Sequence, residues 1–250
     1  MGIRQVPPGG TATPGGGLPA RRWRKVGRVG KKALTSAAED YLKVIWTAQE
    51  WTDAPVTVSA LSAHLGFSAS SVSEAVKKLS AQGFLTHARY GSVALTAAGE
   101  QAAVNMVRRH RLIETFLVEY LGYGWDEVHD EAENLEHAVS DKMVEALAVR
   151  LGHPVRDPHG DPIPAPDGSL PPLDASRLSH SEPGEHLRIA RVSDTSPELL
   201  RYLGGMGLGL DTEISVLERQ AYAGTLTLER GGGRVELGLP AAEAIWVVRA

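Results

Sequence analysis

The chain has 250 residues and a formal net charge of −4, and its 42% hydrophobic and 22% charged residues are typical of a globular protein with a core. The absence of cysteine excludes a disulfide scaffold, a cysteine-based zinc finger, an iron–sulfur protein and a thiol nucleophile. The sequence contains neither a run of 18 apolar residues nor an apolar leader, so we expect a cytoplasmic protein with no membrane partner.

The charge is unevenly distributed along the chain. Residues 1–38 contain eight basic residues and no acidic one, whereas the remaining 212 residues carry 18 basic and 30 acidic ones. Glycine and proline are frequent in residues 1–33, which predicts a disordered basic arm. Such an arm either binds a polyanion or is a leader without function, and composition alone leaves both readings open.

Four predicted elements then follow in an order that is typical of a winged helix. Ser36 and Glu39 form a capping-box pattern that starts a helix ending near Trp51. Two short helices separated by Gly66 indicate a helix-turn-helix between residues 57 and 85, and two β-prone runs around Tyr90-Gly91 indicate a hairpin. The sequence therefore predicts a DNA-binding winged helix-turn-helix over residues 34–100.

The second helix of this motif, starting near Ser68, is the predicted recognition helix. Serine and glutamate side chains can meet base edges, and lysine and arginine can contact phosphates. The predicted DNA-binding residues are Ser68, Ser70, Ser71, Ser73, Glu74, Lys77, Lys78 and, in the wing, Arg89. Lys77 and Lys78 could equally be ordinary solvated surface residues.

Two long helices are predicted next, over residues 97–121 and 125–151, and together they could form a dimer interface. On the second helix four potential ligands fall within about 100° of arc: His129, Glu133, Glu136 and His137. His110 and Glu114, at positions i and i+4, share a face of the first helix. Acidic residues at this spacing repel one another unless a cation lies between them, so the pattern favours a metal site over a solvated acidic face. Imidazole and carboxylate donors suit Mn²⁺, Fe²⁺, Co²⁺ or Zn²⁺.

The last third of the chain changes character. Residues 152–184 hold 8 of the 15 prolines, which predicts a segment with little regular structure. Five short alternating runs follow from about Glu185, with a short helix over residues 197–203, and this pattern indicates a small β-barrel. The fold class is therefore α+β.

The winged helix, the segments RRHRLIETFL and VHDEAENLEHAVSD, and the RDPHGDPIP stretch resemble the diphtheria toxin repressor family of metal-dependent regulators. The resemblance covers roughly residues 34–250 and is greatest for the manganese-responsive, manganese transport regulator type in its three-domain form. It implies a helical dimerisation and metal-binding domain over residues 101–165, a proline-rich linker over 166–184 and an SH3-like, FeoA-type barrel over 185–250.

The resemblance also implies two sets of metal ligands. The primary set consists of Asp40, Glu133, Glu136 and His137, and the ancillary set consists of His110, Glu114 and His129. Iron-responsive members have methionine and cysteine at the positions of Asp40 and Glu133, and carboxylates there favour manganese. Some two-domain manganese members have a glutamate at the position of Lys43. Iron-type members have further ligands in the barrel. Only one of those positions has a matching residue in this sequence, Glu198, which is therefore a possible extra ligand.

We therefore expect a regulator, most simply a repressor of manganese uptake genes, that binds a palindromic operator as a homodimer when Mn²⁺ is bound. No small organic substrate is expected. Three alternatives stay open: an iron-dependent repressor of the same family, a carboxylate-bridged metalloenzyme, and a metal-independent regulator whose barrel binds a protein or peptide.

Overall fold

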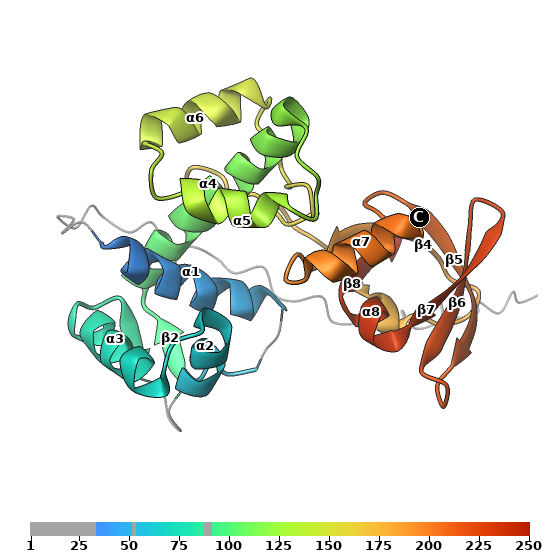
Figure 1. The fold of residues 1–250 in the computed structure, drawn as a ribbon, viewed down its shortest axis with the longest axis horizontal. Coiled ribbons are helices and arrows are strands. Elements are labelled where there is room, and N and C mark those ends of the chain that lie inside the picture. The colour runs from blue at the N-terminus through green and yellow to red at the C-terminus, as the bar shows by residue number, and fades with distance from the viewer. Residues whose placement is uncertain (1–33, 52–53, 88–91) are drawn as a thin grey trace, which may run out of the picture.

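The computed structural model describes residues 34–51, 54–87 and 92–250, which form three parts with separate hydrophobic cores (Figure 1). The predicted basic arm and Arg89 lie outside the described residues. No helix in the described part of the chain is long and apolar enough to cross a membrane.

The first part is the winged helix that the sequence predicts. Its elements are α1 (Ser36–Trp51), α2 (Val58–Leu65), α3 (Ala69–Ala81), β1 (Leu85–His87) and β2 (Val93–Leu95). The side chains of Thr57 and Ser68 cap α2 and α3 by accepting backbone hydrogen bonds. Gly66 ends α2 with a φ of +69°, a left-handed conformation that suits glycine and produces the tight turn into α3.

The expected capping box at the start of α1 is wrong. Thr35 Oγ1 accepts the hydrogen bond from the backbone N–H of Ala38 at 3.3 Å, so the cap lies one residue earlier than Ser36. Glu39 instead contacts His137 from another part of the fold, with its Oε2 at 3.1 Å from Nδ1.

The second part is helical. α4 (Ala97–Leu121) begins at the Thr96 cap and ends at Gly122 as expected, and α5 (Val128–Leu135) and α6 (Asp141–Arg150) pack against it (Figure 1). The prediction of one helix over residues 125–151 is wrong, because the chain leaves α5 after Leu135. Ser140 then caps α6 by accepting a hydrogen bond from the N–H of Met143. The turn between α5 and α6 carries Glu136 and His137.

The third part is a six-stranded antiparallel sheet in the order β3-β8-β4-β5-β6-β7. Its elements are β3 (Ser176–Arg177), a 3-10 helix (Leu178–His180), β4 (His186–Val192), α7 (Pro197–Gly205), β5 (Glu213–Gln220), β6 (Thr225–Arg230), β7 (Gly233–Gly238), α8 (Leu239–Glu243) and β8 (Ile245–Arg249). The five predicted strands and the helix that follows Ser196 are present. The expected linker end at residue 184 is wrong, because β3 already pairs with β8 and two residues are too few to show an alternating pattern.

Buried charges join the sheet domain to the other two parts. Arg191 on β4 forms an ion pair with Asp161, and its guanidinium lies 3.8 Å from the centre of the Trp51 ring at the end of α1. Arg111 on α4 contacts Glu50 at 2.5 Å and Asp161 at 3.4 Å. The end of α1, the middle of α4 and the sheet are thereby held around residues 157–163.

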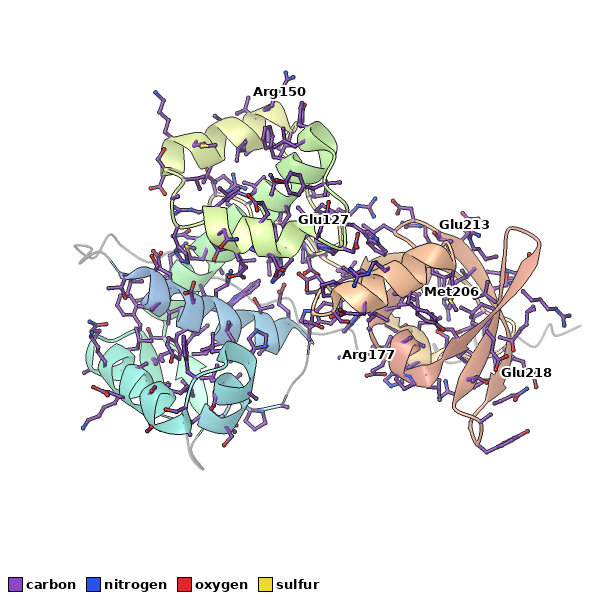
Figure 2. The ribbon with its side chains drawn as sticks, in the orientation of Figure 1. Glu127, Arg150, Arg177, Met206, Glu213 and Glu218 are labelled. Atoms are coloured by element: carbon purple, nitrogen blue, oxygen red, sulfur yellow. The ribbon has the colours of Figure 1, made fainter. Side chains whose placement is uncertain are left out.

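Two further contacts hold the sheet domain against the other two parts. Arg177 donates a hydrogen bond to the carbonyl oxygen of Trp51, and Figure 2 shows Arg177 at the edge of the sheet domain that faces α1. Gly160 has a φ of +89°, and a Cβ there would lie 2.1 Å from the carbonyl oxygen of Ala190. Only glycine therefore allows this segment to approach β4 so closely.

Candidate metal centres and DNA-binding surface

The first cluster of metal-ligating side chains bridges the winged helix and the helical domain. His137 Nε2 lies 2.7 Å from Asp40 Oδ1 on α1 and 3.6 Å from Glu136 Oε1. Ligand atoms of Asp40, Glu136 and His137 all lie within 4.8 Å of one another. Burial raises the pKa of Asp40 above its ordinary value, and the hydrogen bond from His137 opposes this shift. Three of the four predicted primary ligands are therefore brought together.

Glu133, the fourth predicted primary ligand, groups with His110 and Glu136 rather than with Asp40 and His137, and it faces a lysine. Lys43 Nζ on α1 donates hydrogen bonds to Glu133 Oε1 at 2.6 Å and to Glu136 Oε1 at 2.5 Å. The other oxygen of Glu136, Oε2, accepts a hydrogen bond from His110 Nδ1 at 2.7 Å. Burial acts to raise the pKa of the Glu136 carboxyl, but its bond with His110 and the charges around it lower the pKa overall.

The predicted ancillary ligands form a second cluster next to the first. His110 Nε2 lies 3.0 Å from Glu114 Oε1 and 3.2 Å from His129 Nδ1, and His129 Nδ1 lies 3.3 Å from the same Glu114 oxygen. Asp194, which follows β4, joins them with Oδ2 at 3.0 Å from His129 Nδ1. All four residues offer ligand atoms within 4.8 Å of one another.

The neighbouring charges in this second cluster favour the ionised forms of its histidine and aspartate side chains. Burial acts to lower the pKa of His110 and His129, but the carboxylates outweigh it and raise these pKa values to about 9 and about 11. Burial acts to raise the pKa of Asp194, yet its hydrogen bond with His129 and the histidine charge lower it to about 2. Two imidazolium groups thus supply the positive charge that the carboxylates require.

A third group of ligand atoms shares Glu114 with the second. Glu114 Oε2, Asp157 Oδ2 and His159 Nδ1 are buried, and among the described residues none of the three atoms has a hydrogen-bond partner. His159 Nε2 donates to the carbonyl oxygen of Trp125 at 2.6 Å, so in the neutral imidazole Nδ1 carries the lone pair that can bind a cation. A buried polar atom without a partner is unfavourable, and three that converge fit a cation.

A cavity of about 280 Å³ lies beside the second cluster and is lined by His110, Glu114, His129, Glu133, Asp157 and Asp194, with other residues that include Lys43. The donors are carboxylate oxygens and imidazole nitrogens, which suit divalent first-row metals. The site residues present in this chain therefore fit a divalent cation.

Sequence reasoning missed Asp157, His159 and Asp194. Asp157 and His159 lie in the RDPHGDPIP stretch, where the spacing of an acid and a histidine was a usable signal. Asp194 had no such signal. Glu198, which we expected as an extra ligand, is not brought to a cluster within the described chain. It lies exposed in the first turn of α7, where its carboxylate contacts Ser196 and Arg201.

The predicted recognition helix α3 buries one face and exposes the other. Val72, Val76 and Leu79 are buried in the core of the winged helix. The predicted DNA-binding residues within the described chain are all exposed: Ser68, Ser70, Ser71, Ser73, Glu74, Lys77 and Lys78. Ser68 Oγ lies 2.9 Å from the hydroxyls of Ser70 and Ser71, which gathers three serines at the start of the helix.

Three family models match the chain in order. They are the iron dependent repressor N-terminal DNA binding domain (residues 33–93), the iron dependent repressor metal binding and dimerisation domain (96–165) and the FeoA domain (176–249). The diphtheria toxin repressor of Corynebacterium efficiens is 28% identical over 86% of this chain and 96% of the relative. The iron-dependent repressor IdeR of Mycobacterium leprae is 31% identical over 62% of this chain and 70% of the relative. The chain belongs to the diphtheria toxin repressor family.

Among solved structures, a manganese-dependent transcriptional repressor in complex with manganese is 51% identical, with a TM-score of 0.81 over 85% of this chain and all of that one. Members of the diphtheria toxin repressor family are regulators and not enzymes, so the metalloenzyme alternative is removed. The protein is a metal-dependent, DNA-binding transcriptional repressor that dimerises and binds operator DNA.

Proposed function

We propose that the protein is a manganese-activated repressor of manganese uptake genes that acts in the cytoplasm on a palindromic operator. The observation that carries this proposal is the first cluster, in which Asp40 of the winged helix lies 2.7 Å from His137 of the helical domain. Asp40 and Glu133 are carboxylates, and hard oxygen donors suit Mn²⁺ better than the sulfur ligands at these positions in iron-responsive members. The manganese-dependent repressor among the solved structures supports the same choice.

The mechanism follows from where the ligands are attached. Asp40 lies on α1, which packs in the core of the winged helix, whereas Glu136 and His137 belong to the helical domain. A divalent cation bound by these residues supplies the positive charge that offsets their carboxylates. Asp40 and His137 then hold α1 at a fixed angle to the helical domain, which orders the two α3 helices of a dimer for neighbouring major grooves.

The clusters around Glu114 are proposed as additional metal sites. His110, Glu114, His129 and Asp194 would hold one cation, and Asp157 and His159 would complete coordination on the other side of Glu114. Asp194 follows β4 of the sheet domain, and His159 lies in the segment that contacts β4, so a cation held there would link the sheet domain to α4.

The test is a gel shift with operator DNA in EDTA, Mn²⁺, Zn²⁺ and, without oxygen, Fe²⁺. We expect Mn²⁺ to promote binding most strongly at matched free metal, and His137→Ala to abolish the response while circular dichroism stays unchanged. Glu198→Ala, which alters an exposed carboxylate outside the clusters, is the matched control and should respond like the wild type. Equal binding in EDTA and Mn²⁺ would refute the proposal, and a stronger response to Fe²⁺ would favour the iron-dependent alternative.

A further inference from the structure

Lys43 occupies an unusual position for a lysine. Its side chain is only 8% exposed, and its ammonium group lies between two carboxylates, at 2.6 Å from Glu133 Oε1 and 2.5 Å from Glu136 Oε1. A lysine is buried in this way only when it is paired. Lys43 follows Asp40 by three residues on α1, so both side chains lie on the same face of that helix.

This position conflicts with metal binding. Glu136 Oε2 accepts a hydrogen bond from His110, and Glu136 Oε1 accepts one from Lys43, so both oxygens of this buried carboxylate are engaged. Glu133 Oε1 is engaged by the same ammonium group. A cation that coordinates Glu136 through Oε1 therefore needs an oxygen atom that Lys43 now binds, and an ammonium group and a metal ion between the same two carboxylates would repel each other.

We propose that Lys43 is a built-in counter-ion that competes with the activating metal for Glu133 and Glu136 and thereby sets the metal concentration at which the repressor responds. The inference rests on the proposed metal function of Asp40, Glu133, Glu136 and His137. Displacing Lys43 breaks a buried ion pair, and this costs free energy. The free energy gained by metal coordination must be larger than this cost for the metal to bind.

The same competition exchanges one link between the domains for another. Lys43 ties α1 to Glu133 and Glu136 through its ammonium group, whereas coordination would tie α1 to the helical domain through Asp40. Both links start on one face of α1 and end near Glu136, so the exchange changes the position of α1 relative to α5 without releasing it. A repressor built in this way has two defined positions of its winged helix, one for each cation.

The experiment measures Mn²⁺ binding directly, by the electron paramagnetic resonance signal of free Mn²⁺, on the full chain and without DNA. We expect Lys43→Met to lower the dissociation constant of the Asp40 site at least about tenfold, because the competitor is removed. Lys43→Arg keeps the charge and should stay within about threefold of the wild type. Lys142→Met removes one exposed positive charge on α6 and controls for a general change in net charge.

A second measurement needs no variant. Acetylation of Lys43 by a water-soluble reagent, followed by mass spectrometry of the peptide, should be slow without metal and rise several-fold when Mn²⁺ displaces the side chain. Unchanged labelling, or equal or weaker Mn²⁺ binding by a folded Lys43→Met protein, overturns the competition. If the wild type itself binds no Mn²⁺ through Asp40 and His137, the proposed function fails instead, and the two failures are thereby distinguished.

Discussion

The metal-free protein should lose stability as the pH rises from 6.5 to 8.5, because of His110. This histidine is buried between Glu114 and Glu136, and its pKa is raised from 6.5 to about 9. A group whose pKa is higher in the folded state binds more protons there, so its contribution is fully present below pH 6.5 and is lost as the pH rises through 9. Asp157 and His159 also have raised pKa values, which act in the same direction.

The magnitude follows from proton linkage. Between pH 6.5 and 8.5 the folded state holds on average most of one extra proton on His110, so the free energy of unfolding falls by about 1 kcal/mol per pH unit, or about 2 kcal/mol in all. His129 is more than a third exposed, so solvent screening reduces its contribution, and the value above is that of His110 alone.

The assay is urea unfolding in EDTA at pH 6.5, 7.5 and 8.5, followed by circular dichroism at one protein concentration, because dimerisation makes stability depend on concentration. The variant His110→Gln should show a shallower pH dependence, whatever its absolute stability. His186→Gln, which alters an exposed histidine on β4, is the matched control and should keep the wild-type slope. A stability that is flat or rises with pH in the wild type would refute the reasoning.

Three other predictions follow from the same structure. Mn²⁺ binding at pH 7 should release protons, because His110 and His129 have raised pKa values and must become neutral to coordinate a metal. Calorimetry in buffers of different ionisation enthalpy counts the released protons, and a count of zero contradicts the prediction. Asp194→Asn should lower the Mn²⁺ stoichiometry by about one per chain in equilibrium dialysis and preserve the Asp40 site, whereas unchanged stoichiometry would exclude Asp194 as a ligand. Arg191→Ala should destabilise the docked sheet domain by about 3 kcal/mol, because it leaves Asp161 buried with fewer partners. Limited proteolysis of the chain before β3 should then be faster in the variant than in the wild type. Equal cleavage rates in the two proteins would show that this contact is dispensable.

The parts of the fold that sequence predicted well depend on local signals. The glycine at position 66, the serine at position 68 and the apolar spacing of Val72, Val76 and Leu79 are visible in a few residues, so the helix-turn-helix was predicted correctly. The break after α5 was missed because the apolar pattern continues through the turn, and the Ser140 cap is a single serine among many.

The sequence predicted those site residues that lie on one face of a single helix. His110 and Glu114 share a face of α4, and both contribute to clusters in the structure. Asp194 is brought there by the docking of the sheet domain, a tertiary contact that leaves no periodic trace in the sequence. The position of Lys43 was equally hidden, because one side chain at a known distance from two carboxylates can be recognised only in three dimensions.

His110 links the first two clusters, and this link predicts which substitutions affect both. Its Nε2 faces Glu114 and His129 in the second cluster, while its Nδ1 donates to Glu136 of the first. A histidine that coordinates through one nitrogen and donates to a carboxylate through the other fixes that carboxylate, and losing such a partner lowers metal affinity 10–100-fold as a rough guide. His110→Gln should therefore remove the second site and also weaken Mn²⁺ binding at the Asp40 site, whereas His129→Gln should affect only the second. Equal affinity of the Asp40 site in both variants would show that the two clusters are independent.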